Sequence, residues 1–141
     1  MSLDYSFANS GICISKIIDD KIVVLYSDVY LSDKDKEAIP RVTGLVEDIF
    51  DLYDKYSPDI IVKEAGFIGR SSTAKNVMYA HAILELVAYN KGIEIEEIHN
   101  ATLKAYFSSD MPEIYTNRGK LLDDKCDAIA LACFWVENNL K

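Results

Sequence analysis

The sequence predicts one α/β domain over residues 1–141, in which a mixed five-stranded sheet carries helices on both faces. Three antiparallel strands are expected at the N-terminus and two further parallel strands later. Three observations support this fold class. Strand-like segments fill residues 2–31, a helical spacing of apolar residues follows, and short strands then alternate with helices. The length of 141 residues is near the commonest size of one domain, and 50% of the residues are apolar, which is enough for one core.

The N-terminal segment is expected to form three consecutive strands joined by turns. The strands span Ser2–Ser6, Gly11–Ile18 and Lys21–Leu31. Isoleucine and valine are frequent in them, and polar turn residues such as Asp19 and Asp20 separate them. Because β-branched side chains favour the pleated backbone of a strand, we expect an antiparallel meander.

A helix and a buried strand are expected next. Apolar residues recur at helical spacing from Val42 to Tyr56, and Pro40 lies near the first turn, where its missing N–H is harmless. Asp59–Glu64 is a short apolar run between two helices. Such a run is typical of a central parallel strand, which is buried on both faces.

The C-terminal half continues this alternation. A second long helix is expected to be capped by Ser71 or Ser72 and to reach Asn90, with Lys91-Gly92 as its stop signal. The remaining expected elements are a half-exposed strand over Ile93–Ile98, a short helix over Asn100–Phe107, a loop over Ser108–Gly119 and a final helix from Leu121 to Asn139.

Four carboxylates stand at the ends of these expected elements. Asp4 and Glu64 lie near the ends of strands, and Asp124 and Asp127 lie three residues apart on one face of the last helix. Ligands in such sheets bind at the carboxyl ends of parallel strands, so the four acids can converge. Carboxylate oxygens hold Mg²⁺, and two such ions are a common device for cutting phosphodiesters. Each acid alone can equally be a turn or helix-cap residue.

The charge balance bears on the partner. The net charge is −8 and the isoelectric point is about 4.7, which argues against a nucleic-acid partner because phosphate contacts need lysine and arginine. The basic residues nevertheless gather in sequence around the later carboxylates, at Lys63, Arg70, Lys75, Lys104, Arg118, Lys120 and Lys125. No apolar stretch approaches the roughly 20 residues of a membrane span, so no membrane contact and a cytoplasmic location are expected.

Three stretches resemble the RuvC-type Holliday-junction resolvases of the ribonuclease H-like superfamily. They are Leu3-Asp4-Tyr5-Ser6 followed by Gly11, then Ile61-Val62-Lys63-Glu64-Ala65-Gly66-Phe67, and finally Asp124-Lys125-Cys126-Asp127-Ala128-Ile129-Ala130. Their order, spacing and structural context agree with that family from Asp4 to the last helix. The chain is shorter than the bacterial enzymes, so it resembles a reduced, phage-encoded variant such as those of lactococcal phages. That origin implies the cytoplasm of the host cell.

The resemblance implies a structure-selective endodeoxyribonuclease that cleaves Holliday junctions by two-metal-ion hydrolysis. Asp4, Glu64, Asp124 and Asp127 would then bind two Mg²⁺ ions per site, with Mn²⁺ able to substitute, and Lys104 would lie beside the scissile phosphate. The residues expected to contact DNA are Phe67, Arg70, Lys75, Lys104, Arg118 and Lys120, with Arg118 and Lys120 both candidates for a second family lysine. Phe67 can instead be a core residue, and Lys104 can be ordinary solvated surface.

The second long helix carries a wide apolar surface. It is made by Val77, Ala80, Ile83, Leu84, Val87 and Ala88. Deep burial within the chain can explain it. The resemblance favours the alternative, a twofold homodimer that places two active sites on the two symmetric strands of a four-way junction.

Other functions fit the same expected fold. A less selective nuclease would cut forks and flaps, or RNA–DNA hybrids. A non-catalytic DNA-binding module would use the acids as surface charge or as a weak Ca²⁺ site, but it would have no reason to retain all four of them. The two histidines, His81 and His99, are expected to be structural or merely exposed.

Overall fold

The computed structural model describes the chain except residues 20, 67–71, 111–119 and 141, and the side chains of residues 107–110 and 120–126 are also left out. Its elements in chain order are β1 (Ser2–Asp4), β2 (Asn9–Ile18), β3 (Lys21–Leu31), α1 (Ala38–Tyr56), β4 (Ile61–Glu64), α2 (Ala74–Lys91), β5 (Ile95–Ile98), α3 (Asn100–Asp110) and α4 (Lys120–Asn139). Among the described residues, no helix has the combination of length and apolar character that a membrane crossing requires.

The strands form one mixed sheet in the order β3-β2-β1-β4-β5. β1 pairs antiparallel with β2, and β2 pairs antiparallel with β3, which confirms the predicted N-terminal meander. On its other side β1 pairs in parallel with β4, and β4 pairs in parallel with β5. The predicted five-stranded mixed sheet is therefore confirmed, with β1 at its centre.

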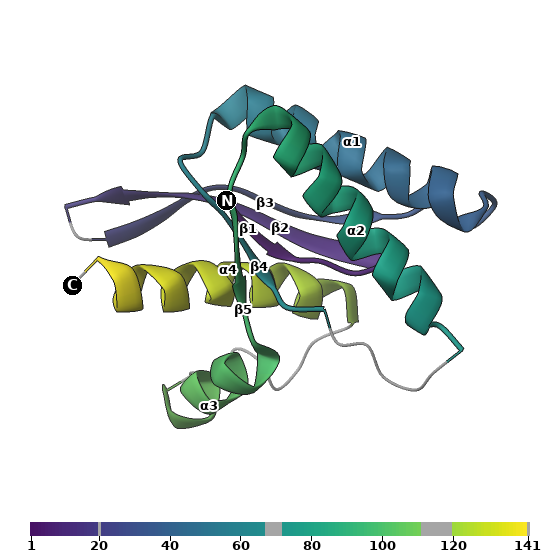
Figure 1. Cartoon of the computed structure of the whole chain (residues 1–141). Coiled ribbons are helices and arrows are strands. Elements are labelled where there is room, and N and C mark those ends of the chain that lie inside the picture. Colours follow the sequence, from purple (N-terminus) through teal and green to yellow (C-terminus); the bar gives the residue numbers. More distant parts are fainter. Residues whose placement is uncertain (20, 67–71, 111–119, 141) are drawn as a thin grey trace.

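Helices cover both faces of this sheet (Figure 1). α1 and α2 pack on one face, around a core that includes Leu3 of β1, Ile61 of β4 and Leu84 of α2. α4 packs on the opposite face, where its Leu131 meets Val62 of β4. Because successive side chains of a strand point to opposite faces, β1 and β4 contribute buried residues to both layers.

The end of β1 differs from the prediction by two residues, since the strand ends at Asp4 and not at Ser6. Ser10 donates from its hydroxyl to the Ser6 carbonyl at 3.3 Å, and the Asn9 N–H donates to Ser6 Oγ at 3.1 Å. Such local side-chain bonds compete with strand pairing and turn the chain directly after Asp4. The Asp4 carboxylate thus sits at the very end of its strand.

The start of α2 also differs from the prediction. The helix begins at Ala74 and its N-cap residue is Thr73, not Ser72 as one alternative held. Ser71, the other alternative, lies outside the described residues.

α2 ends at Lys91, one residue later than predicted, and Gly92 is the predicted stop. Gly92 adopts a positive φ of 69°, and the N–H of Ile93 donates to the Ala88 carbonyl at 2.9 Å. This is the usual way in which a left-handed glycine satisfies the last carbonyls of a helix. Because Ile93 belongs to that cap, β5 begins at Ile95 and not at Ile93.

The C-terminal helices lie against each other below the sheet (Figure 1). α3 runs to Asp110, so the first residues of the predicted 108–119 loop are helical, and residues 111–119 lie outside the described part of the chain. Leu103 of α3 packs in the same cluster as Leu131 of α4. This contact fixes one face of α3 beside the ends of β4 and β5.

Candidate functional site

The pairing of β1 with β4 brings two of the predicted acids together. The parallel register sets Ser2 beside Val62 and Leu3 beside Lys63, so the next residues along the two strands are Asp4 and Glu64. Side chains alternate along a strand, so both acids point to the same face as Ser2 and Val62, the face that α4 covers. Both are half-buried at the carboxyl edge of the sheet.

The last helix supplies a third acid. The Ser2 hydroxyl donates to the Ala128 carbonyl of α4 at 2.6 Å, which fixes the helix against the start of the short strand β1. Asp127 precedes Ala128 and lines a cavity of about 80 Å³ together with both strand-end acids. The complete lining is Asp4, Glu64, Asn100, Leu103, Lys104, Asp127 and Leu131. Three of the four predicted acids and the predicted lysine therefore meet at one place.

α3 adds an amide that sequence reasoning missed. The Asn100 amide donates a hydrogen bond to Glu64 Oε1. The Ala65 N–H donates to the Ile98 carbonyl at 2.9 Å, and this bond holds the end of β4 beside the start of α3. A carboxylate can accept from an amide with one oxygen and bind a cation with the other, so Asn100 can orient Glu64 as a ligand. The one sequence signal was its place two residues after a strand and four residues before Lys104.

The donor set of the cavity fits a hard divalent cation. Three carboxylates and one amide line it, and carboxylate and amide oxygens are the ligands that Mg²⁺, Mn²⁺ and Ca²⁺ prefer. A volume of about 80 Å³ has room for a few atoms of ion and water, since a water molecule takes up roughly 30 Å³ in the liquid. Lys104 also lines the cavity and is exposed, and an ammonium of this kind suits a phosphate oxygen.

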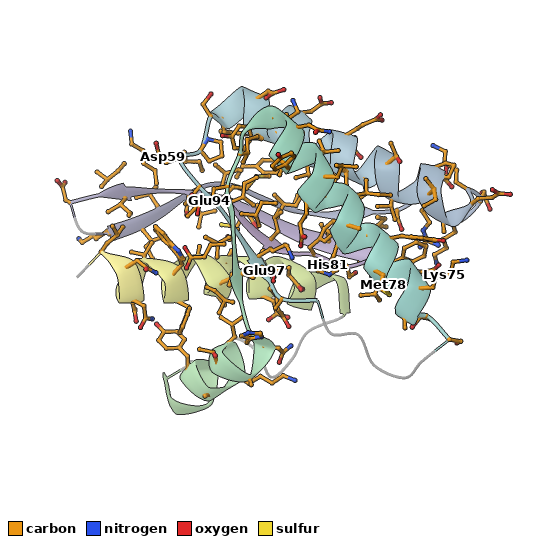
Figure 2. All side chains as sticks on the ribbon, viewed as in Figure 1. Asp59, Lys75, Met78, His81, Glu94 and Glu97 are labelled. Carbon is orange, nitrogen blue, oxygen red and sulfur yellow. The ribbon has the colours of Figure 1, made fainter. Side chains whose placement is uncertain are left out.

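The other predicted contact residues are not brought to this cavity by the described part of the structure. Lys75 is exposed near the start of α2, and its ammonium lies 5.4 Å from the centre of the Tyr79 ring (Figure 2). The remaining predicted positions fall outside the described residues or side chains, and these are Phe67, Arg70, Arg118, and the side chains of Lys120 and Asp124.

A second polar cluster lies on the opposite face of β4, and we call Lys63, His81, Glu85 and Glu97 the Lys63 cluster. The Lys63 side chain is completely buried. Its ammonium bonds to Glu97 Oε1, and it lies 3.0 Å from His81 Nδ1 and 3.2 Å from Glu85 Oε1. Figure 2 shows His81 on α2 and Glu97 on β5. The cluster thus joins β4, β5 and α2.

The Lys63 cluster is not a second metal centre. Ligand atoms of His81, Glu85 and Glu97 do lie within 4.8 Å of one another, a spacing that could hold an ion. However, the Lys63 ammonium already bonds to all three and carries the positive charge that they compensate. A metal ion would have to displace a buried ammonium that has nowhere else to be solvated.

The chemistry of His81 follows from this arrangement. Burial and the neighbouring Lys63 charge lower the pKa of His81 to about 4, so the ring is neutral near pH 7. An ammonium can only donate, so Nδ1 accepts its bond and the ring proton is on Nε2. The prediction that His81 is structural left out this contact. The sequence signal was Lys63 itself, a charged residue inside an apolar strand, which needs a buried partner.

Comparisons with known proteins cover nearly the whole chain, although no family model matches the sequence. The crossover junction endodeoxyribonuclease RuvC of Prochlorococcus marinus strain MIT 9312 is 26% identical over 144 residues, covering 94% of this chain and 92% of that protein. The structure of T. thermophilus RuvC in complex with a Holliday-junction substrate aligns with a TM-score of 0.74 at 15% identity, covering 97% of this chain and 93% of the other. The yeast mitochondrial Holliday-junction resolvase Ydc2 aligns with a TM-score of 0.71 at 13% identity, covering 94% of this chain and 75% of the other.

Proposed function

We propose that this chain is an endonuclease that cleaves branched DNA, because it belongs to the family of RuvC-type Holliday-junction resolvases. The observation that carries the proposal is the meeting of Asp4, Glu64, Asp127 and Lys104 in one cavity at the carboxyl edge of the sheet. These residues come from β1, β4, α4 and α3, so the cavity exists only in the folded chain. A silent binding module would need no such convergence.

We further propose that the cavity works with two Mg²⁺ ions, for which Mn²⁺ can substitute. Bound divalent cations would lower the pKa of a water molecule and stabilise the leaving oxygen. Asp4, Glu64 and Asp127 would be their ligands, with Asp124 as the fourth acid on the same helix. Asp4 would be held between the other ligands, because β1 pairs with β4, which carries Glu64, and α4 packs on β1 next to Asp127. Lys104 would hold a phosphate oxygen at the rim.

Binding of DNA beyond the cavity would rest on other basic and aromatic residues of the chain. We propose Phe67 as a surface against which bases stack, and Arg70, Lys75, Arg118 and Lys120 as phosphate contacts. Stacking of a base on an aromatic ring contributes roughly 1–3 kcal/mol and reads little sequence, which suits a nuclease that selects a branch by its shape. The four-way junction is therefore the substrate that we expect to be preferred over forks, flaps and hybrids.

The test is cleavage of a labelled synthetic four-way junction with and without Mg²⁺. We expect paired, symmetric nicks near the crossover in Mg²⁺ and none in EDTA. A linear duplex of the same sequence is the matched control, and flaps, forks and RNA–DNA hybrids are compared at equal concentration. If RNA–DNA hybrids are cut efficiently while the four-way junction stays uncut, the substrate is the hybrid. If the junction is bound but is not cut in any divalent metal, the non-catalytic module is favoured.

We also propose that the chain acts as a homodimer through the outer face of α2. The apolar residues that suggested a dimer divide in the structure, since Ala80, Leu84 and Ala88 are buried within the chain. Other large apolar residues of α2 are exposed, namely Met78 at 53%, Leu86 at 58% and Tyr89 at 81%. Positions 78, 86 and 89 share one face of a helix. An apolar helix face of this kind suits a twofold contact with a second copy.

Leu86→Glu is expected to dissociate this dimer. Two copies of the new carboxylate would face each other across a twofold axis, and like charges so placed weaken association by roughly 10- to 100-fold. Sedimentation equilibrium at micromolar concentration measures the effect against a protomer mass of 15.9 kDa. Leu25→Glu is the matched control, because Leu25 is 50% exposed on β3, away from α2. A wild-type chain that sediments as a monomer at these concentrations would refute the dimer.

A further inference from the structure

His81 contacts the strand ends that carry both cavity acids, from the opposite face of the sheet. Its ring packs edge-on against Tyr5, the residue after Asp4, with 5.4 Å between the ring centroids and 82° between the planes. Its Nδ1 accepts the bond from Lys63, the residue before Glu64. One side chain of α2 therefore touches the neighbours of Asp4 and of Glu64.

Gly66 makes a third contact with the same ring. A Cβ atom built on Gly66 would lie 2.6 Å from His81 Nε2 and under 3.0 Å from two ring carbons, which is closer than carbon atoms pack. The backbone that leaves β4 after Glu64 thus runs directly against the histidine. Only glycine permits this approach, because every other side chain would force the ring or the backbone to move.

The ring is itself held firmly. The Tyr5 hydroxyl donates to the Ala80 carbonyl at 3.0 Å, so the partner of the ring is tied to the same helix. Ala80 is completely buried, and Tyr5 is nearly so. Lys63 is bound by Glu97 of β5 as well as by the histidine, which prevents the ammonium from following a shift of α2 alone. The ring therefore has a fixed place relative to both strands.

We propose that His81 is a positioning residue that fixes the separation of Asp4 and Glu64 through Tyr5, Lys63 and Gly66. The inference rests on the proposed function in one respect, since it takes these two acids to be ligands of a shared metal site. His81 touches neither the metal nor the DNA in this role. Ligands of a metal site are oriented by such outer contacts, and losing one weakens metal affinity or activity by roughly 10- to 100-fold.

The first expected effect is a loss of turnover and of metal affinity in His81→Ala. We expect kcat for junction cleavage to fall by about 10- to 100-fold, because small misplacements of reacting groups reduce rates by up to roughly that factor. Junction binding in EDTA should stay within about twofold of wild type, since phosphate and base contacts dominate it. Affinity for Mn²⁺, measured by calorimetry on the protein without DNA, should fall by about tenfold.

The second expected effect is a specific coupling between Gly66 and His81. Gly66→Ala in the wild-type chain should lower kcat by at least about tenfold, because the new methyl group meets the imidazole. In the His81→Ala chain the ring is absent, so the same Gly66→Ala change should alter kcat by less than about twofold. A merely structural histidine would give no reason for the two changes to depend on each other in turnover and in Mn²⁺ affinity.

The control separates positioning from loss of stability. Leu84→Val removes one buried methylene from the same helix, and Leu84 belongs to the apolar core and not to the Lys63 cluster. We expect it to lower the unfolding temperature yet leave kcat and Mn²⁺ affinity within about twofold, since it moves no ligand. All variants are compared well below their own unfolding temperatures.

The outcomes distinguish this inference from the proposed function. If the wild-type chain cuts junctions and His81→Ala keeps its kcat and Mn²⁺ affinity, the positioning role is wrong and the function stands. The positioning role is also wrong if Gly66→Ala lowers kcat equally in the wild-type and His81→Ala chains. It is wrong as well if Leu84→Val lowers kcat and Mn²⁺ affinity as much as His81→Ala does. A wild-type chain that neither binds Mn²⁺ nor cuts any branched DNA overturns the proposed function, and the positioning role falls with it.

Discussion

Asp4→Asn and Glu64→Gln are each expected to abolish cleavage of a four-way junction while leaving the junction bound. Each change keeps the size of the side chain but removes a negative oxygen that a divalent cation would bind. Losing one ligand of a catalytic metal site removes several kcal/mol of transition-state stabilisation, so we expect kcat to fall by at least about 10³-fold. Binding should persist or tighten, because the change also removes a charge that repels the phosphates.

Two exposed acids of α1 provide matched controls for these variants. Asp48→Asn and Glu47→Gln make the same chemical changes on a helix that covers the other face of the sheet. Both should cleave at the wild-type rate. Cleavage is followed on gels in Mg²⁺, and binding is followed by fluorescence anisotropy in EDTA. If Asp4→Asn or Glu64→Gln cuts the junction as fast as wild type does, that carboxylate is not a ligand of the catalytic metal.

The sequence predicted the sheet and the place of its acids because both depend on local patterns. The apolar run that ends at Glu64 and the β-branched segments before residue 31 indicate strands whatever the rest of the chain does. Once β1 and β4 are parallel neighbours, acids at their ends must meet. The boundaries were less accurate, because local bonds such as those of Ser6 decide where pairing stops.

Partners far apart in sequence could not be predicted in this way. Asn100 reaches Glu64 across 36 positions, and Lys63 reaches Glu97 across 34. Both pairs depend on the register of β5 against β4, which no local pattern specifies. The exposed apolar residues of α2 illustrate the same limit, since a helical wheel of α2 does not tell which apolar residues face the sheet and which face outward.

Glu97→Gln is expected to lower the free energy of unfolding by about 2 kcal/mol. Removing one partner of a buried charge generally costs roughly 3–5 kcal/mol, because the remaining charge is left without compensation. Here the Glu97 side chain is 46% exposed, and Glu85 remains 3.2 Å from the buried ammonium. Water and the second acid therefore offset part of the loss. Chemical denaturation near pH 7 measures the change in unfolding free energy. Glu94→Gln is the matched control, because Glu94 is exposed.

The unfolding free energy that is lost in Glu97→Gln should depend on pH. The hydrogen bond from Lys63 holds the pKa of Glu97 below its ordinary value of 4.5. The stabilisation from Glu97 is then fully present above about pH 4.5 and is lost as the pH falls through the lowered pKa. The unfolding free energies of wild type and Glu97→Gln should accordingly converge in acid. A difference that stays constant down to the lowest pH would show that the effect does not come from this ion pair.

Lys63→Met separates stability from placement. Methionine has nearly the length of lysine without its charge, and replacing a buried charge by a well-packed apolar side chain is often neutral or stabilising. We expect Lys63→Met to unfold at or above the wild-type midpoint, and Glu97→Gln to change that chain by less than about 0.5 kcal/mol. The variant loses the donor to His81, however, so its turnover should fall although its stability does not. If Lys63 adds nothing to stability, its role lies in its contacts with His81 and Glu97. These contacts hold β4 in place directly before Glu64.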